Sequence, residues 1–174
     1  MALYEFEGKV PKIGKETYIA ETTDVIGDVV IGNNCYIGPG ARIKGDYGSI
    51  RIGNETSVQE NCIIHVRPNE ICHVGNQVTV GHGAILHNCT VQDGAIIGMG
   101  AIVSDWAIVE KNALVAEGAV VCQSQRIPEG NVAIGVPAKI NGLVSERVKS
   151  EWHMYKTVYV DLARRYRQGL KRIQ

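Results

Sequence analysis

Aliphatic residues recur every six positions along most of the chain, and this spacing is the strongest pattern in the sequence. The series is interrupted by steps of nine, ten and five residues. Self-similarity at a fixed short period is the signature of a repeat architecture. The eighteen positions are Ile13, Ile19, Val25, Ile31, Ile37, Ile43, Ile52, Val58, Ile64, Val74, Val80, Leu86, Val91, Ile97, Val103, Val109, Val115 and Val121.

A small residue follows most of these aliphatic residues four positions later. Side chains two apart on a strand share a face, so the small residue and the next aliphatic residue both point inward. Thr90 is the expected small residue before the five-residue step. Tyr47 and Pro68 break the rule where the spacing jumps, and we expect insertions there. The intervening Gly, Asn, Asp and Pro residues are turn formers.

Short strands joined by turns predict a prism with three flat faces and about eighteen residues per coil, stacked as a solenoid. Grouping the eighteen aliphatic positions in threes gives six coils. We therefore predict a mainly β fold, a parallel β-helix of about six triangular coils in residues 1–125. Residues 126–143 are expected to form a connector, and residues 144–174 a C-terminal helix within a single domain.

The hydrophobic period changes in the C-terminal segment. Apolar residues from Val148 to Ile173 are spaced three or four apart, which predicts an amphipathic helix. Ser145 is the expected N-cap. We expect the apolar stripe to pack on the prism or a neighbour, and the basic outer face to be solvated.

Charge and cysteine content narrow the functional classes. Lys plus Arg (18) equals Asp plus Glu (18), so no charge excess points to nucleic acid or an anionic membrane. No run reaches the roughly 18 apolar residues of a membrane span. The five cysteines form no CxxC pair, and the first ten residues contain no signal-like apolar stretch. These features predict a cytoplasmic protein.

Two histidines are expected to stack at one corner of the prism. His65 and His87 each follow an inward aliphatic residue directly and lie 22 residues apart. The ten-residue step after Ile64 adds four residues to the usual six, so the remaining separation is eighteen, or one coil. Adjacent coils lie about 4.8 Å apart, which allows both imidazoles to reach one metal ion.

A third histidine, His82, lies one corner earlier in the coil. Strand geometry places that corner more than about 10 Å from the first pair. Metal–nitrogen bonds are only about 2 Å long, so one chain does not easily bring all three histidines to one ion. A neighbouring prism can supply His82, and a threefold ring closes such a contact with one site per interface. The sequence thus predicts an oligomer if the three histidines share a metal.

Three neutral histidines with an open fourth position form a catalytic metal arrangement, in which bound water ionises near neutral pH to give a hydroxide nucleophile. Gln59 lies on the corner of His82 and is a candidate to orient water or substrate. Glu60 beside it is a candidate to accept a proton. Lys44 and Asp46 lie one coil before His65, where we favour an intersubunit ion pair.

The other histidines and cysteines receive simpler interpretations. We expect His73 and His153 to be surface residues, with His73 and Cys72 as candidate ligands outside the main site. Cys35 and Cys62 occupy small inward positions and are expected to fill the core.

The segments "KGDYGSIRIGNETSVQENCIIH", "VTVGHGAILH" and "IGMGAIV" resemble the γ-class carbonic anhydrase family of hexapeptide-repeat proteins. The resemblance extends over nearly the whole chain and implies a left-handed β-helix. It also implies a homotrimer with Zn²⁺, or Fe²⁺ or Co²⁺, at each interface. In that arrangement His65 and His87 come from one subunit and His82 from the next.

The resemblance assigns further residues and shows departures. The family's arginine-glycine-aspartate motif falls on Lys44, Gly45 and Asp46, so lysine replaces an arginine that can bind a carboxylate through two parallel bonds. Gln59 matches its substrate-orienting glutamine, Glu60 the neighbouring acid, and Tyr159 a tyrosine of its C-terminal helix. The acidic proton-shuttle loop of the best-studied members is absent, and the short loop here offers only Glu70.

Four functions are consistent with these residues. The first is reversible hydration of carbon dioxide to bicarbonate. The second is hydrolysis of acyl-CoA thioesters by the same metal site, as proposed for short-loop members found with phenylacetate or carnitine metabolism. The third is a metal-free hexapeptide acyltransferase, which needs only one histidine as a base. The fourth is a catalytically inactive trimeric scaffold. Neither nucleic acid nor membrane is an expected partner.

Overall fold

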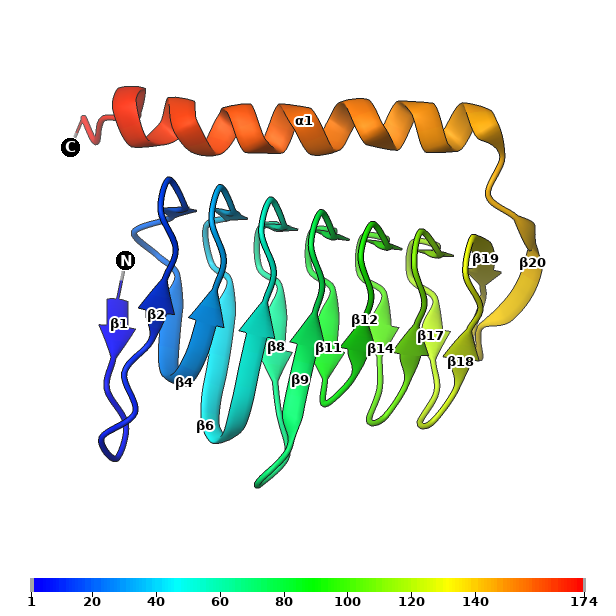
Figure 1. Ribbon diagram of the computed structural model, residues 1–174, viewed down its shortest axis with the longest axis horizontal. Coiled ribbons are helices and arrows are strands. Elements are labelled where there is room, and N and C mark those ends of the chain that lie inside the picture. The colour runs from blue at the N-terminus through cyan, green and yellow to red at the C-terminus, as the bar shows by residue number, and fades with distance from the viewer. Residues whose placement is uncertain (1, 174) are drawn as a thin grey trace.

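The computed structural model describes residues 2–173 and shows a parallel β-solenoid with a long helix along one side (Figure 1). The predicted mainly β architecture and the C-terminal helix are confirmed. No helix among the described residues combines the length and apolar character needed to cross a bilayer.

Strands of successive coils stack in three columns, which form the faces of the prism. The first two columns merge into one sheet because β4 (Asp24–Ile31) and β6 (Arg42–Ile52) run continuously from one face to the next. The first column adds β1 (Ala2–Tyr4), β8 (Ile63–His65), β11 (Ile85–His87), β14 (Ile102–Val103) and β17 (Val120–Val121); the second adds β2 (Lys12–Ile13), β9 (Ile71–Val74), β12 (Thr90–Val91), β15 (Ile108–Val109) and β18 (Arg126–Ile127); the third contains β3 (Tyr18–Ile19), β5 (Tyr36–Ile37), β7 (Ser57–Val58), β10 (Thr79–Val80), β13 (Ile96–Ile97), β16 (Leu114–Val115), β19 (Asn131–Ile134) and β20 (Lys139–Leu143).

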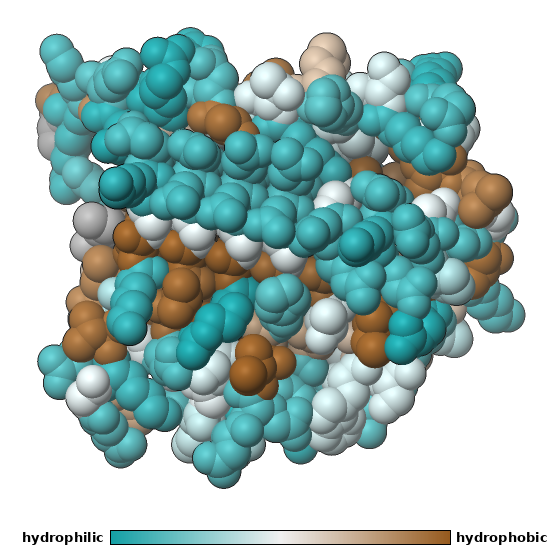
Figure 2. Space-filling view, in the orientation of Figure 1, coloured by the Kyte–Doolittle hydropathy of each residue, from teal (hydrophilic) through white to brown (hydrophobic). Residues whose placement is uncertain are grey.

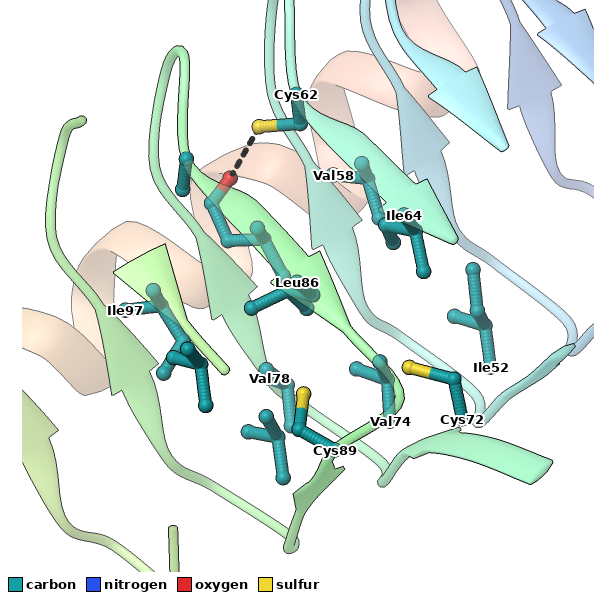
Figure 3. Close-up of a cluster of buried hydrophobic side chains, with 14 of the residues drawn as sticks. Ile52, Val58, Cys62, Ile64, Cys72, Val74, Val78, Leu86, Cys89 and Ile97 are labelled. Carbon is teal, nitrogen blue, oxygen red and sulfur yellow. Dashed lines mark hydrogen bonds between the residues drawn. The ribbon is translucent and has the colours of Figure 1, made fainter. Parts of the chain in front are cut away.

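The interior of the prism is filled by the predicted aliphatic and small residues. Ile64, Leu86 and Ile97 come from neighbouring coils and have no exposed surface. Figure 3 shows these side chains pointing into a common core. Cys35 and Cys62 are also fully buried, which confirms their expected role as core residues.

The prism has about seven coils rather than the expected six. β18 pairs with β15, and β19 pairs with β16, so the stack continues into the segment expected to be a connector. Ile127 and Ala133 keep the six-residue spacing and are fully buried. The pattern is harder to read there because Gln125 and Asn131 occupy positions that carry small residues in earlier coils.

Two inward positions differ from the prediction. Cys89 has 1% of its surface exposed, whereas Thr90 is half-buried, so Cys89 is the inward residue. In a six-residue step, the residue four places after one aliphatic residue is also two places before the next. The step from Leu86 to Val91 has five residues, so these two rules give Thr90 and Cys89 respectively, and the alternation along the strand selects Cys89. By the same rule Cys72, two places before Val74, is fully buried. Cys72, one of the two candidate ligands outside the main site, lies buried in the core (Figure 3).

A ladder of side-chain hydrogen bonds runs along the corner between the second and third columns. Asn33 Oδ1 accepts from the N–H of Lys15 at 2.7 Å, and Asn54 Oδ1 accepts from the N–H of Asn33 at 2.8 Å. Asn76 and Asp93 continue the series at 2.9 and 2.7 Å. Each side chain satisfies a turn N–H of the preceding coil that no strand pairs. Figure 2 shows a hydrophilic band along the length of the molecule, with a hydrophobic band beside it.

Helix α1 (Glu146–Gly169) packs along the third column. Its predicted N-cap is confirmed, because Ser145 Oγ accepts from the N–H of Val148 at 3.3 Å. Tyr159 lies against Tyr36 of β5, with ring centroids 5.3 Å apart. Ala163 is fully buried in the same contact. The helix thereby covers one face of the prism and adds its own side chains to one corner of it.

Candidate metal centre

Two histidines end stacked strands at the corner between the first and second columns. β8 and β11 pair in parallel with His65 opposite His87, so the predicted one-coil register is confirmed. The Nδ1 atom of His65 lies 3.3 Å from the Nε2 atom of His87. Parallel pairing therefore brings two ring nitrogens face to face.

Each imidazole of this pair has a carboxylate at its other nitrogen. Nε2 of His65 lies 3.1 Å from Oδ1 of Asp46, and Nδ1 of His87 lies 2.6 Å from Oδ1 of Asp105. An ionised carboxylate only accepts hydrogen bonds, so each neutral ring carries its proton on the nitrogen that faces the carboxylate. The two nitrogens that face each other then both present lone pairs. This arrangement is repulsive without a cation and suits a metal ion.

Cationic side chains keep both carboxylates ionised. Arg67 Nη2 donates to Asp105 Oδ2 at 2.9 Å, and this bond lowers the pKa of Asp105 against an opposing effect of burial. Burial raises the pKa of Asp46, but hydrogen bonds led by that from Lys44 hold it below its usual value. The Nζ atom of Lys44 lies 3.0 Å from Asp46 Oδ2. Both acids therefore act as acceptors for the histidines.

The separation of the facing nitrogens fits tetrahedral coordination. Two nitrogens bound at about 2.0–2.1 Å in a tetrahedron lie about 3.3–3.4 Å apart. The measured separation between His65 and His87 is 3.3 Å. Among residues 2–173 of one chain, no three His, Cys, Asp or Glu side chains group so that they can hold a metal. Among the described residues, one chain thus brings two imidazole nitrogens together without a third candidate ligand beside them.

The third histidine lies at a different corner. His82 is in the turn between β10 and β11, and its Nδ1 lies 2.5 Å from Glu60 Oε2. The other carboxylate oxygen of Glu60 accepts from the hydroxyl of Tyr36 at 2.7 Å. Tyr36 therefore holds Glu60, and Glu60 holds the ring of His82. The side chain of His82 is 46% exposed, which leaves Nε2 able to bind a ligand outside the chain.

A pocket of about 160 Å³ opens beside His82. Gln59 lines it and is 4% exposed. Tyr159 of α1 lines the same pocket, and burial raises the pKa of its hydroxyl. The remaining wall is largely apolar and includes Ile97, Met99, Trp152 and Tyr155.

The residues singled out in the sequence fall into two groups at two corners of the prism. The ion pair expected between subunits joins Lys44 to Asp46 within one chain. His73 and His153 are exposed, as predicted. The first group contains Lys44, Asp46, His65 and His87, and the second contains Gln59, Glu60, His82 and Tyr159.

Sequence reasoning missed two residues that hold the histidines. Asp105 lies eighteen residues after His87, so the coil arithmetic that paired the histidines also identifies it. Tyr36 lies 24 residues before Glu60, which is not a whole number of coils. The long side chain of Tyr36 makes the contact, so the residue spacing does not predict it. The carboxylate of Glu70 is fixed by two hydrogen bonds: its Oε2 accepts from Asn88 Nδ2 at 2.6 Å and from the indole N–H of Trp106 at 2.7 Å.

Comparison with known proteins places this fold and site in context. The bacterial transferase hexapeptide (six repeats) family matches residues 11–45. A solved hexapeptide transferase family protein from Anaplasma phagocytophilum is similar with a TM-score of 0.91 and 32% identity, over 95% of this chain and 98% of that one.

Curated relatives carry more specific names. The carbonic anhydrase of Geobacillus kaustophilus is 38% identical over 165 residues, covering 95% of this chain and 91% of the relative. The carnitine operon protein CaiE of Salmonella typhimurium is 34% identical over 170 residues, covering 98% and 86%. The mitochondrial gamma carbonic anhydrase 2 of Arabidopsis thaliana is 43% identical over 137 residues, covering 75% of this chain. The match spans about half the length of this plant relative (49%).

The triangular parallel β-helix places this protein in the hexapeptide-repeat class. Its stacked histidines, each bonded to a carboxylate, form a candidate metal site. Within that class, the chain belongs to the γ-class carbonic anhydrase-like family, and it is also similar to the CaiE proteins.

Proposed function

We propose that this protein catalyses the reversible hydration of carbon dioxide to bicarbonate, with a divalent metal held between the subunits of a homotrimer. The observation that supports this proposal is the pair of ring nitrogens of His65 and His87 that face each other at 3.3 Å, each ring having a carboxylate at its other nitrogen. When bound, a divalent metal at this position supplies a Lewis acid that activates water near neutral pH. Zn²⁺ suits three imidazole ligands, and Fe²⁺ or Co²⁺ are the alternatives.

The third ligand in this proposal is His82 of a second copy. Glu60 accepts the Nδ1–H of His82, so Nε2 is the nitrogen that bears the lone pair. A head-to-tail contact that closes after three copies makes three equivalent sites. Each site then combines the His65 and His87 corner of one subunit with the His82 corner of the next.

The second corner also brings the residues that act on the substrate. Gln59 offers a fixed amide to orient carbon dioxide or water, and Glu60 is the acid placed to take up a proton. Tyr159 closes the pocket from α1 with its hydroxyl, and burial raises the pKa of that group further above neutrality. The apolar wall suits a small, uncharged substrate.

Metal content and carbon dioxide hydration of the wild-type protein, His87→Ala and His82→Ala test the site directly. Wild type should carry one metal per chain, and each variant should lose metal and activity together. His153→Ala, an exposed histidine on α1, is the matched control and should keep both. A metal-free wild-type protein after anaerobic, metal-supplemented purification would refute the proposal.

Mixing the two inactive variants tests sharing between subunits. A trimer that contains both His82→Ala and His87→Ala subunits has one interface at which all three histidines are intact. Random mixing of equal amounts makes three quarters of the trimers mixed, so activity should return to about a quarter of wild type. No recovery after subunit exchange, verified by mass spectrometry of mixed trimers, would exclude a shared site.

A second candidate function is hydrolysis of small acyl-CoA thioesters by the same metal site. The observation that favours it is the apolar wall beside Gln59 and His82, which can contact an acyl chain. The same protein preparations, assayed with short acyl-CoA substrates, distinguish the two reactions. Thioester hydrolysis that is lost in His87→Ala, without carbon dioxide hydration in wild type, would select the thioesterase.

A further inference from the structure

A second, larger cavity of about 570 Å³ lies between the first half of α1 and the last coils of the prism. It is separate from the histidine corners, although Trp152 lines both this cavity and the pocket beside His82. Trp152 and Ile96 give it an apolar wall, and Gln77 and Asn112 add side-chain amides.

Lys156 is the unusual charged group of this cavity. Its side chain is partly buried under α1, and its Nζ donates to the carbonyl of Gly94 at 2.5 Å. No ion pair among residues 2–173 includes Lys156, whereas Lys149 in the same cavity pairs with Glu146 at 2.6 Å. Lys156 also lines an adjoining cavity of about 250 Å³, so its side chain borders two cavities. Burial lowers the pKa of Lys156 to about 8, and no carboxylate counteracts that effect.

The charges in the cavity are separated along the helix. Glu146 and Lys156 are ten residues apart on α1, or about 15 Å along the axis. Glu129 lies at the β-helix side of the large cavity, and Glu55 lines the adjoining one, where its Oε2 accepts from Gln77 Nε2 at 2.8 Å. Neither acid forms an ion pair with Lys156 among the described residues. Lys156 therefore has an ammonium without an ion-pair partner among the described residues, and Trp152 lines the same cavity.

We propose that this cavity binds a small organic monocarboxylate, with Lys156 as the cationic contact and Trp152 and Ile96 against the hydrocarbon part. One ammonium with three donors compensates a single negative charge, and one donor is already used by Gly94. A phosphate dianion carries a second negative charge, and Lys149, the other lysine of the cavity, is already paired with Glu146. The apolar wall gives an organic anion an advantage over an inorganic one.

Butyrate binding to Trp106→Phe protein tests the proposal, because Trp152 is then the remaining tryptophan of the chain. Butyrate should change the fluorescence of Trp152 saturably, while chloride and phosphate at the same ionic strength should not. Lys156→Met should weaken butyrate binding at least tenfold. Lys149→Met, which removes a paired lysine of the same cavity, should stay within twofold.

Lysine side-chain NMR of the unmutated protein supplies a measurement that does not depend on a variant's folding. The Cε signal assigned to Lys156 should shift with butyrate at the same midpoint as the fluorescence, and other lysine signals should not. No saturable shift in the wild-type protein, equal butyrate affinity in Lys156→Met, or equal responses to butyrate and phosphate would each overturn the proposal.

Discussion

Asp105 Oδ1 lies 2.6 Å from His87 Nδ1, and the two residues belong to successive coils of the same column corner. The carboxylate is itself held by Arg67 at 2.9 Å, so the histidine ring is fixed by two side chains in sequence. The repeat therefore sets the orientation of the His87 ring, because it places the supporting carboxylate of Asp105 one coil further along the chain.

Asp105→Asn should weaken metal binding about 10- to 100-fold, because an amide no longer enforces the Nδ1–H tautomer of His87. Competition with a chromogenic chelator measures this change. Asp161→Asn removes an acid of α1 that pairs with Arg164 at 2.7 Å and should leave metal affinity unchanged. Equal metal affinity in wild type and Asp105→Asn would show that Asp105 does not support a ligand.

Tyr36→Phe should lower kcat/KM for the proposed hydration reaction roughly 2- to 10-fold, since one hydrogen bond to Glu60 is worth about 1 kcal/mol. Steady-state kinetics at constant metal occupancy measure the effect. Tyr166→Phe is the matched control, because Tyr166 belongs to the same aromatic cluster and its ring lies 5.8 Å from that of Tyr36. Identical kinetics for both variants would show that the hydrogen bond from Tyr36 to Glu60 does not contribute to the reaction.

Ile64→Ala should destabilise the fold by about 2–5 kcal/mol, because it leaves a cavity in a fully packed interior. Its neighbour Ile63 offers a matched control of the same residue type, being 43% exposed where Ile64 has no exposed surface. Ile63→Ala should cost less than about 1 kcal/mol. Urea unfolding at one fixed protein concentration compares the two, since the proposed association would also contribute to stability. Similar losses of unfolding free energy in the two variants would contradict the alternation of inward and outward side chains along β8.

Lys156→Met should raise the free energy of unfolding at neutral pH by on the order of 1–3 kcal/mol. The folded-state pKa of about 8 lies below the ordinary lysine value of 10.5, so the unfolded chain binds more protons between these values. The contribution of Lys156 to stability therefore improves as pH rises from about 8 to 10.5. Urea unfolding at several pH values should show that the difference between wild type and Lys156→Met shrinks over this range. A constant difference would indicate an unperturbed lysine.

The repeat and the histidine pair were predictable because both depend on spacing. A six-residue period fixes which side chains face inward, and the same count places His87 one coil after His65. The spacing also explains one wrong prediction. The step before Val91 is shortened, so the inward position is Cys89. Residues such as Gln125, which is not small, conceal the last coil although the spacing continues.

Contacts between the helix and the prism were not predictable in the same way. The apolar period of α1 indicates which face is buried, but it does not specify the level at which each side chain meets the prism. The contact of Lys156 with Gly94 joins residues 62 apart, and it depends on the length of the connection before the helix. The bond from Tyr36 to Glu60 likewise depends on side-chain reach.

The strand β20 determines how these prisms can associate. It pairs antiparallel with β19 at the last coil, and the register shift between Asn131 and Ala133 interrupts a regular edge. A stacked coil of another molecule needs a regular parallel edge, so β20 blocks growth of a filament from this end. The proposed association then uses the lateral corners, where the histidines lie, and such an assembly can close on itself as a ring of limited size.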